Sequence, residues 1–488
     1  GKVASVADHA GATTYAYADA AGNRTVTVTN ALSEASVYTF LITSERLTKY
    51  KDPLNNETTY TYDANGRLTR ITKPESNYVN YTYDARGNVT ESRNVAKSGS
   101  GAADIVATAT YPASCSNPRT CNSPTATTDP RGNVTDYTWD STHGGLLTVT
   151  APAPTVGAGR PKQTYTYVAK QAQVKNSSGG IVGTGINITL PASVSQCATL
   201  ASCSGGADEI KSSVTYGSNG VANNLLPTEV ASGNGSGTLT ATTTLAYDNI
   251  GNLITVDGPL PTTDDTTTAI YDNLRRPYGI ISPDPDGGGG RPRLAQRSIF
   301  ATNGDTTKIE IGTATGTTAA DLAAMTVAQA TDMVYDADGR KLKDTLTGGG
   351  SSHAVSQYSY DAAGRMTCAA QRMNPATWGT LPASACTLAT AGGFGPDRIT
   401  KSLRDANGRV TTVQTAFGVT GEQADERVTA YSANGVLSHV IDANLNRTTY
   451  EYDGHDRLTK TRYPLPAIGS NSSSTTDFEL LALDPSGN

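Results

Sequence analysis

Aromatic and polar side chains alternate in short stretches of this chain, most clearly from Tyr60 onward. Residues 60–69 read YTYDANGRLT, and residues 81–90 repeat the phrase as YTYDARGNVT, with a step of 21 residues from Asp63 to Asp84. Alternate side chains of a strand share one face, and Tyr and Thr suit a half-buried pleated surface. The pattern predicts a strand, a turn and a returning strand in each unit. Because an isolated hairpin is marginally stable in water, each unit must pack on its neighbours.

The turn after each strand has the form Asp-x-x-Gly. The Asp carboxylate accepts a hydrogen bond from a backbone N–H two residues on, and Gly adopts the positive φ that the exit needs. We therefore interpret the repeated Asp residues as turn caps rather than as general acids or calcium ligands. Residues 284–287 (DPDG) come nearest to a calcium loop but lack the remaining acidic positions and the distant Glu.

The unit recurs along most of the chain. Upstream of Asp63, the equivalent positions Asp19 and Leu41 give steps of 22, 22 and 21 residues to Asp84. Such regularity predicts a repeat array. The structural residues of the best-preserved copies are Tyr60, Tyr62, Asp63 and Gly66; Tyr81, Tyr83, Asp84 and Gly87; Tyr358, Tyr360, Asp361 and Gly364; and Tyr450, Tyr452 and Asp453.

We expect residues 1–488 to form one array. It has regular repeats at 1–95, a looser cysteine-bearing region at 96–245, a Gly-rich loop at 283–292 and regular repeats at 331–488. Residues 176–234 are rich in Gly, Ser and Asn, which predicts longer loops between short strands. Residues 319–330 form the one predicted helix, capped by Thr317 or Thr318.

The two ends of the sequence fit the same period. If Gly1 followed Asn488, Asp484 would lie 23 residues before Asp19. The sequence also begins without Met, inside repeat-like residues, so we expect it to be a segment of a longer polypeptide. Similar segments would then continue at both ends, either covalently or by stacking head to tail.

Composition supports a β-rich repeat protein and excludes some functions. Hydrophobic residues make up 37% of the 488 and charged residues 17%, with 24 Tyr and 49 Gly. The net charge of −6, without a basic cluster, gives no electrostatic footprint for nucleic acid. No apolar run reaches the roughly 20 residues of a membrane helix.

The phrase Tyr-x-Tyr-Asp-x-x-Gly-Arg/Asn-Leu/Val-Thr resembles the YD repeat of the RHS family. That family includes bacterial RHS toxin shells, the shell component of Tc toxins, wall-associated YD-repeat proteins and the animal teneurins. The resemblance is strong at 15–90, 137–140, 247–252, 335–365 and 405–458 and weak from 150 to 240. It implies an all-β fold in which tandem hairpins wind a continuous antiparallel spiral sheet into a hollow shell, barrel or tube. RHS toxin shells enclose a toxic domain, but no autoproteolytic core segment or toxin-like domain is found in this sequence.

The six cysteines fall into three local pairs: Cys115 and Cys121, Cys197 and Cys203, and Cys368 and Cys386. All lie in loop-like sequence, where a disulfide would stabilise by restricting the unfolded chain. Disulfides would imply an oxidising, extracellular or periplasmic setting. Other thiol states and a metal site are the alternatives, although no Cys-x2–4-Cys spacing occurs.

No sequence motif supports catalysis. The histidines (His9, His143, His353, His439 and His455) are scattered, and no nucleophile elbow, phosphate-binding loop or dinucleotide fingerprint is present. We expect no catalytic residues, no cofactor and no metal. The Tyr-x-Tyr pairs predict cross-strand aromatic ladders rather than a sugar-binding platform.

These observations favour a non-catalytic, secreted or cell-surface structural protein, built as a tube, filament or shell wall that partners itself. A toxin-encapsulating shell is the first alternative. A cell-surface adhesin that binds glycans or neighbouring cells through the cysteine-bearing loops is the second.

Overall fold

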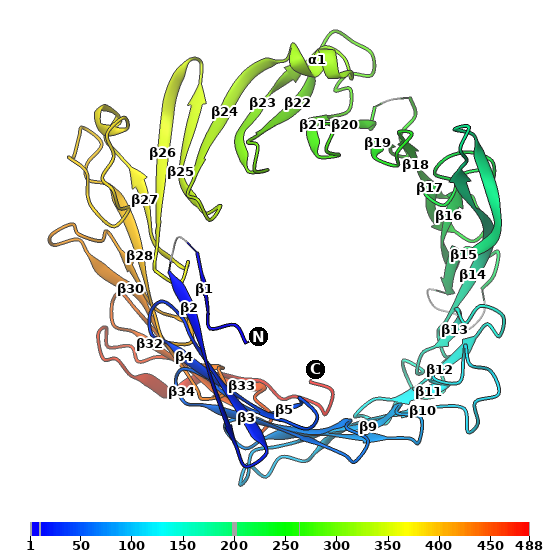
Figure 1. Ribbon diagram of the computed structural model, residues 1–488, viewed down its shortest axis with the longest axis horizontal. Helices are drawn as coiled ribbons and strands as arrows, with labels where there is room; N and C mark the ends of the chain where they lie inside the picture. The colour runs from blue at the N-terminus through cyan, green and yellow to red at the C-terminus, as the bar shows by residue number, and fades with distance from the viewer. Residues whose placement is uncertain (1, 9–10, 198–202, 263, 488) are drawn as a thin grey trace. The chain divides into compact units, whose positions relative to one another are not determined.

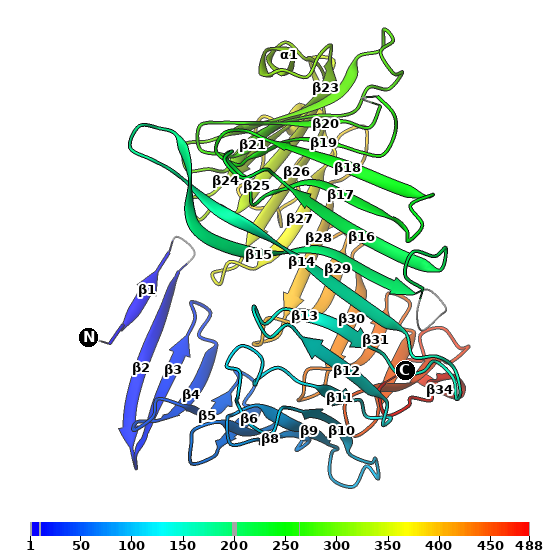
Figure 2. The same cartoon turned by 90° about the vertical axis from the view of Figure 1, so that its right-hand side faces the viewer.

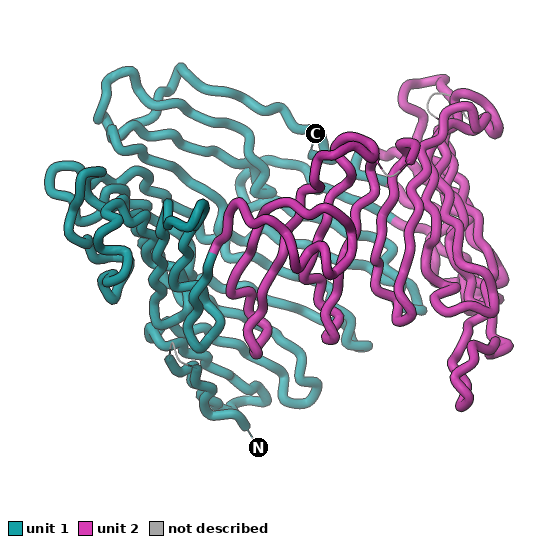
Figure 3. The backbone as a smooth tube through the Cα atoms, turned by 90° about the horizontal axis from the view of Figure 1, so that it is seen from above, with its two compact units in different colours: residues 1–108, 129–131, 332–488 teal, residues 109–128, 132–331 magenta. Residues whose placement is uncertain are grey.

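The computed structural model describes residues 2–8, 11–197, 203–262 and 264–487. These residues form two compact units, shown in Figure 3: unit 1 (1–108, 129–131 and 332–488) and unit 2 (109–128 and 132–331). The expected division of the array into regular and looser stretches is a different one and stays a prediction. The 34 strands assigned in the described residues belong to one antiparallel sheet.

Figure 1 follows the strands in chain order. The first ten are β1 (Ser5–Ala7), β2 (Ala12–Ala20), β3 (Asn23–Thr29), β4 (Ala35–Leu41), β5 (Leu47–Lys51), β6 (Glu57–Tyr62), β7 (Leu68–Thr72), β8 (Tyr78–Tyr83), β9 (Val89–Val95) and β10 (Ile105–Thr110). The next fourteen are β11 (Ala126–Thr128), β12 (Val134–Trp139), β13 (Leu146–Thr150), β14 (Lys162–Lys175), β15 (Ile181–Cys197), β16 (Glu209–Tyr216), β17 (Pro227–Asn234), β18 (Thr240–Tyr247), β19 (Leu253–Asp257), β20 (Thr267–Tyr271), β21 (Pro277–Ile281), β22 (Arg293–Phe300), β23 (Thr306–Ala314) and β24 (Thr326–Tyr335). The last ten are β25 (Lys341–Gly348), β26 (Ser351–Tyr360), β27 (Met366–Arg372), β28 (Arg398–Arg404), β29 (Val410–Thr415), β30 (Ala424–Tyr431), β31 (Leu437–Asp442), β32 (Arg447–Tyr452), β33 (Leu458–Pro464) and β34 (Ser473–Leu480).

Strands pair with their sequence neighbours, as a meander of hairpins does. In the motif hairpins the register shifts immediately before the second aromatic residue, as between Thr61 and Tyr62 and between Thr82 and Tyr83. A bulge of this kind places one extra residue on the returning strand and increases the local twist. Thr69 occupies that position, and its hydroxyl donates to the carbonyl of Thr61 at 3.2 Å. The bulge thus explains the Thr that follows Arg-Leu in the motif.

Buried apolar residues are few, and they gather in two small clusters. In unit 2, Leu322 of α1 (Ala319–Ala323) packs with Ile281, Ala295 and Met325. In unit 1, Cys368, Ala370, Ala385 and Ile399 pack together. Most strand residues are only half buried, so backbone ladders and polar turns contribute much of the order.

The predicted helix at 319–330 is too long. Thr318 caps α1 through a reciprocal hydrogen-bond pair with Asp321, but the helix ends at Ala323 and residues 326–335 form β24. The backbone at Thr326 passes so close to Gly312 that a Cβ there would lie 2.0 Å from the Thr326 carbonyl oxygen. Thr326 and Val327, both β-branched, favour this extended pairing over helix. No helix in the described part of the chain is long and apolar enough to cross a bilayer.

The prediction of short strands at residues 176–234 is wrong. β15, within that range, has 17 residues and pairs with the 14-residue β14 that precedes the range. The Asn176 side chain accepts from the N–H groups of Ser178 and Gly180, which confines the turn to five residues. β-Branched residues such as Ile181 and Val182 then resume the strand. The Gly, Ser and Asn content thus marks a tight turn at 176–180, whereas residues 217–226 form a longer connection between β16 and β17.

Candidate functional site

A motif turn that begins with Asp is closed by the side chain of that Asp. Asp63 Oδ1 accepts from the Arg67 N–H at 2.9 Å, and Asp63 Oδ2 accepts from Arg67 Nε at 2.6 Å. The backbone N–H bond from Arg67 is the main reason that the pKa of Asp63 lies below its ordinary value. Gly66 takes φ +77° between them. Where Asn replaces Arg, as at Asn88, its amide donates to Asp84 Oδ2 at 2.8 Å. The carboxylates of these turns are therefore occupied by their own loops.

Successive motif hairpins are joined through the second Tyr and the Arg of the preceding turn. The Arg67 guanidinium lies 4.9 Å from the ring centre of Tyr83, and the Tyr83 hydroxyl donates to the Leu68 carbonyl at 2.6 Å. The same pairing joins Arg46 to Tyr62, Arg340 to Tyr360, and Arg409 to Tyr431. A cation over an aromatic face contributes about 0.5–1 kcal/mol at an exposed site.

The predicted ladder of Tyr rings is therefore wrong, because the second Tyr of these hairpins contacts an Arg and not another Tyr. Among the described residues, Tyr38 and Tyr50 form the one Tyr–Tyr ring pair, with centres 5.0 Å apart. Tyr60, Tyr62, Tyr81, Tyr83, Tyr358, Tyr360, Tyr450 and Tyr452 lie in β6, β8, β26 and β32, and none of them pairs ring to ring with another Tyr in the described residues. The bulge removes the simple alternation that would have stacked these rings, and it turns the second ring toward the preceding Arg.

The chain returns to its own N-terminal hairpins within unit 1. The turns opposite the motif turns, here called the opposite turns, join each returning strand to the next hairpin. Opposite turns at 30–34, 52–56, 73–77, 97–103 and 129–131 contact motif turns at 361–365, 405–409, 432–436, 453–457 and 484–487. We name this row of contacts the seam. Figure 2 shows β6, β8 and β9 at the bottom of the view and β30 and β31 above them.

The seam confirms the predicted spiral winding of a continuous antiparallel sheet. The residues it joins are 331 to 383 positions apart, and both rows advance in the same direction along the chain. Arg365 pairs with Glu34 at 3.1 Å, and the Asn407 amide donates to Asp52 Oδ2 at 2.5 Å. A cavity of about 610 Å³ lies at this end of the seam and is lined by these side chains and Tyr50.

Asp456 contacts several turns of the seam, and only 5% of its side chain is exposed. It pairs with Lys97 at 2.6 Å and with Lys73 at 3.1 Å, and the amides of Asn77 and Asn434 each donate to its Oδ2 at 2.9 Å. Burial alone would raise the pKa of Asp456, but these four donors outweigh it and lower the pKa to about 2. The carboxylate therefore holds both rows of turns together in its charged form.

The sequence of this turn departs from the motif where the seam requires it. Residues 453–457 read DGHDR, so Asp456 occupies the position that is Gly in the other well-preserved copies and takes φ +67°. Gly454 replaces the usual Ala, because a Cβ there would lie 2.3 Å from Ser100 Oγ. Its carbonyl accepts from the Lys97 N–H at 2.8 Å. A local strain at Asp456 is thus offset by long-range contacts.

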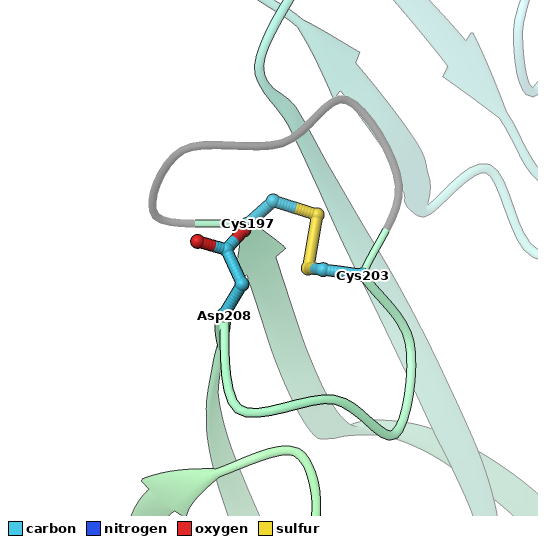
Figure 4. Close-up of side chains that lie close together, drawn as sticks. All are labelled: Cys197, Cys203 and Asp208. Carbon is cyan, nitrogen blue, oxygen red and sulfur yellow. A yellow bond between two sulfur atoms is a disulfide. The ribbon is translucent and has the colours of Figure 1, made fainter.

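The structure joins all six cysteines in disulfides: Cys115 to Cys121, Cys197 to Cys203, and Cys368 to Cys386. Figure 4 shows Asp208 beside the second of these bonds. Cys197, Cys203 and Asp208 are close enough to suggest a metal site. Metal ligation requires thiolates, however, and both sulfurs are committed to each other. We therefore assign no metal to this group.

The disulfide between Cys368 and Cys386 ties down the insert at 373–397 together with a buried ion pair. Arg372 donates to Asp397 at 2.6 Å, and their side chains are 0% and 2% exposed. Burial by itself raises the pKa of Asp397, but the N–H groups of Ala389 and Met373 and the guanidinium lower it overall. Sequence reasoning missed this pair, since neither residue belongs to a motif.

The histidines that the structure describes have no common site. The ring centre of His143 lies 4.5 Å from that of Tyr167, with the ring planes tilted by 59°. His455 contacts the Ala103 carbonyl, and His439 faces Arg447. His353 contacts the Gly348 carbonyl, and His9 lies outside the described residues. Burial and the nearby Arg447 lower the pKa of His439.

The geometry defines an all-β repeat protein whose recurring side chains hold turns and windings together. Residues 46–78, 63–98 and 431–466 match the family described as RHS Repeat. The chain thus carries RHS repeats over residues 46–98 and 431–466. No curated protein matches the chain.

Solved structures similar to this chain include a TcdB2-TccC3-Cdc42 crystal structure, at 10% identity over 93% of this chain and 30% of that chain, with TM-score 0.27. A Photorhabdus luminescens Tc holotoxin pore carrying the TccC3-D651A mutation has 10% identity over 95% and 31%, with TM-score 0.26. A porin-like protein from Bacteroides uniformis has 10% identity over 68% and 91%, with TM-score 0.15. This chain thus spans about a third of the Tc chains, and we base no argument on superpositions with such scores.

Proposed function

We propose that the chain is a non-catalytic structural wall, in which RHS hairpins wind so that one winding docks on the next. The observation that carries this proposal is the seam. Its carboxylates and amides bond to turns more than 330 residues away and are thereby unavailable for other chemistry. A wall needs docked turns of this kind, because hairpins of two strands are marginally stable until they pack on their neighbours.

The setting we propose is extracellular or at a cell surface. Three disulfides support it, because such bonds persist in oxidising compartments. In the family, shells of this kind enclose a toxic domain, and this stretch would supply wall rather than cargo. A tube or filament built from the same seam is the second form of the proposal.

Electron cryomicroscopy of the purified chain tests the proposal. We expect a wound sheet in which the turn at 405–409 lies on the turn at 52–56. Particles that enclose a hollow would support the shell, whereas open cylinders of variable length would support the tube. Hairpins that extend as a single ribbon, without contact between these turns, would contradict both forms.

A further inference from the structure

The two kinds of turn that form the seam, motif turns and opposite turns, also occur outside the seam. Residues 63–67 and 405–409 are the same pentapeptide, DANGR, and each forms the same closed motif turn. In the second copy, Asn407 lies half buried and donates to Asp52 across the seam. In the first copy, the equivalent Asn65 is exposed.

The acceptor of that hydrogen bond has a counterpart as well. Asp52 heads an opposite turn in which Oδ1 accepts from the N–H groups of Leu54 and Asn56, and Oδ2 accepts from the Asn56 amide at 2.9 Å. Asp442 heads an opposite turn with the same three bonds, from Asn444, Asn446 and the Asn446 amide. Each turn also presents an exposed Leu, namely Leu54 and Leu445. Asp442 is exposed, whereas Asp52 is half buried beneath Asn407.

Two turns outside the seam are complementary in hydrogen bonding. In the seam, Arg365 and Asn407 on motif turns meet Glu34 and Asp52 on opposite turns. Outside the seam, the motif turn at 63–67 presents the exposed amide of Asn65, and the opposite turn at 442–446 presents the exposed carboxylate of Asp442. An exposed donor on one row of unit 1 thus matches an exposed acid on the other.

We propose that a second copy of this chain docks through these rows, so that Asp442 of one copy accepts a hydrogen bond from Asn65 of the next. The contact would repeat between molecules the bond that joins Asn407 to Asp52 within one. The inference rests on the proposed structural function, because it reuses the same seam. It goes further by naming the partner and the residues at the contact.

Sedimentation velocity over a concentration series tests this docking, with Asn65→Asp as the main variant. That substitution sets a carboxylate against Asp442, and we expect association to weaken about tenfold or more, since a hydrogen bond to a charged group changes an equilibrium by that order. The motif tolerates Asp there, because Asp338 occupies the same position of the turn at 336–340. Asp442→Asn added to Asn65→Asp restores a donor facing an acid, and we expect association to recover. Asp477→Asn, an exposed Asp within β34, is the matched control and should leave association unchanged.

Amide exchange at Lys97 separates the two proposals, because its N–H bond to Gly454 forms only when the seam is closed. A protected Lys97 amide with no association at any concentration would overturn the docking proposal and leave the proposed function standing. Association that is equal in Asn65→Asp and in the unaltered chain, or that the double variant fails to restore, would also overturn it. An unprotected Lys97 amide would count against the wound wall itself.

Discussion

Replacing Asp456 by Asn should open the seam without altering the hairpins. The side chain keeps its shape and its tolerance of positive φ, but it loses the charge that faces Lys97 and Lys73. A fall of the carboxyl pKa from 3.8 to about 2 corresponds to about 2 kcal/mol of stabilisation in the charged form. The buried side chain, 5% exposed, makes solvent screening a small correction.

Hydrogen exchange at the Lys97 amide is the suitable assay, because it reports the seam and not the hairpin. A loss of about 2 kcal/mol predicts exchange about 30-fold faster in Asp456→Asn than in the unaltered chain. Asp63→Asn is the control, since that Asp caps a motif turn outside the seam and should leave Lys97 unaffected. Equal Lys97 exchange in Asp456→Asn and the unaltered chain would refute the role given to this carboxylate.

The same carboxylate predicts a pH dependence with a definite sign. Its pKa is lower in the folded chain than in the unfolded chain, so its contribution is complete above about pH 4 and disappears as the pH falls through about 2. The difference in thermal midpoint between the unaltered chain and Asp456→Asn should therefore shrink as the pH falls from 4 to 2. A difference that stays constant over this window would show that the charge is not responsible.

Three further substitutions test the seam, the buried ion pair and the contact between successive hairpins one at a time. Gly454→Ala should also speed Lys97 exchange, because the new Cβ would lie 2.3 Å from Ser100 Oγ. Gly393→Ala places its Cβ in open space and should leave Lys97 exchange unchanged, so equal exchange in the two variants would contradict the close approach. Asp397→Asn should lower stability by about 3–5 kcal/mol in chemical denaturation, because it leaves the buried Arg372 without a charged partner, and a loss below about 1 kcal/mol would refute that role. Arg67→Met should lower the free energy of unfolding by about 1–2 kcal/mol, because Arg67 bonds Asp63 and the Asp84 carbonyl and covers Tyr83. The control Arg86→Met leaves these contacts in place, and equal losses in the two variants would contradict the coupling of successive hairpins.

The hairpins could be predicted from sequence because their determinants are local. Asp63, Gly66 and Arg67 lie within five residues, and the period of 21–22 residues shows that the unit repeats. The bulge before Tyr62 was not evident, since alternation of Tyr and Thr reads the same with or without an extra residue on the partner strand. That missing detail is why the expected partner of the second Tyr was another Tyr rather than Arg.

The seam could not be predicted because it joins residues more than 330 positions apart through exposed-looking turns. One signal was present in the sequence nonetheless. The turn DGHDR at 453–457 replaces the favoured Gly with Asp456 and the usual Ala with Gly454, and both changes are unfavourable for an isolated turn. A repeat copy that departs from its own motif at several adjacent positions is a candidate for a long-range contact.

Thiol cross-linking across the seam tests the central claim most directly. All six native cysteines are paired in disulfides, so Asp52→Cys and Asn407→Cys together introduce the two free thiols of the chain. The side chains they replace are in hydrogen-bond contact, and a short bis-maleimide should join them within one molecule, giving a monomer mass and a peptide that links the two sites. The pair Asp52→Cys and Asn65→Cys, on turns that the seam does not join, should remain unlinked. If Cys pairs at 52 and 407 are alkylated separately and no linked peptide appears, the hairpins do not wind onto one another and the account is wrong.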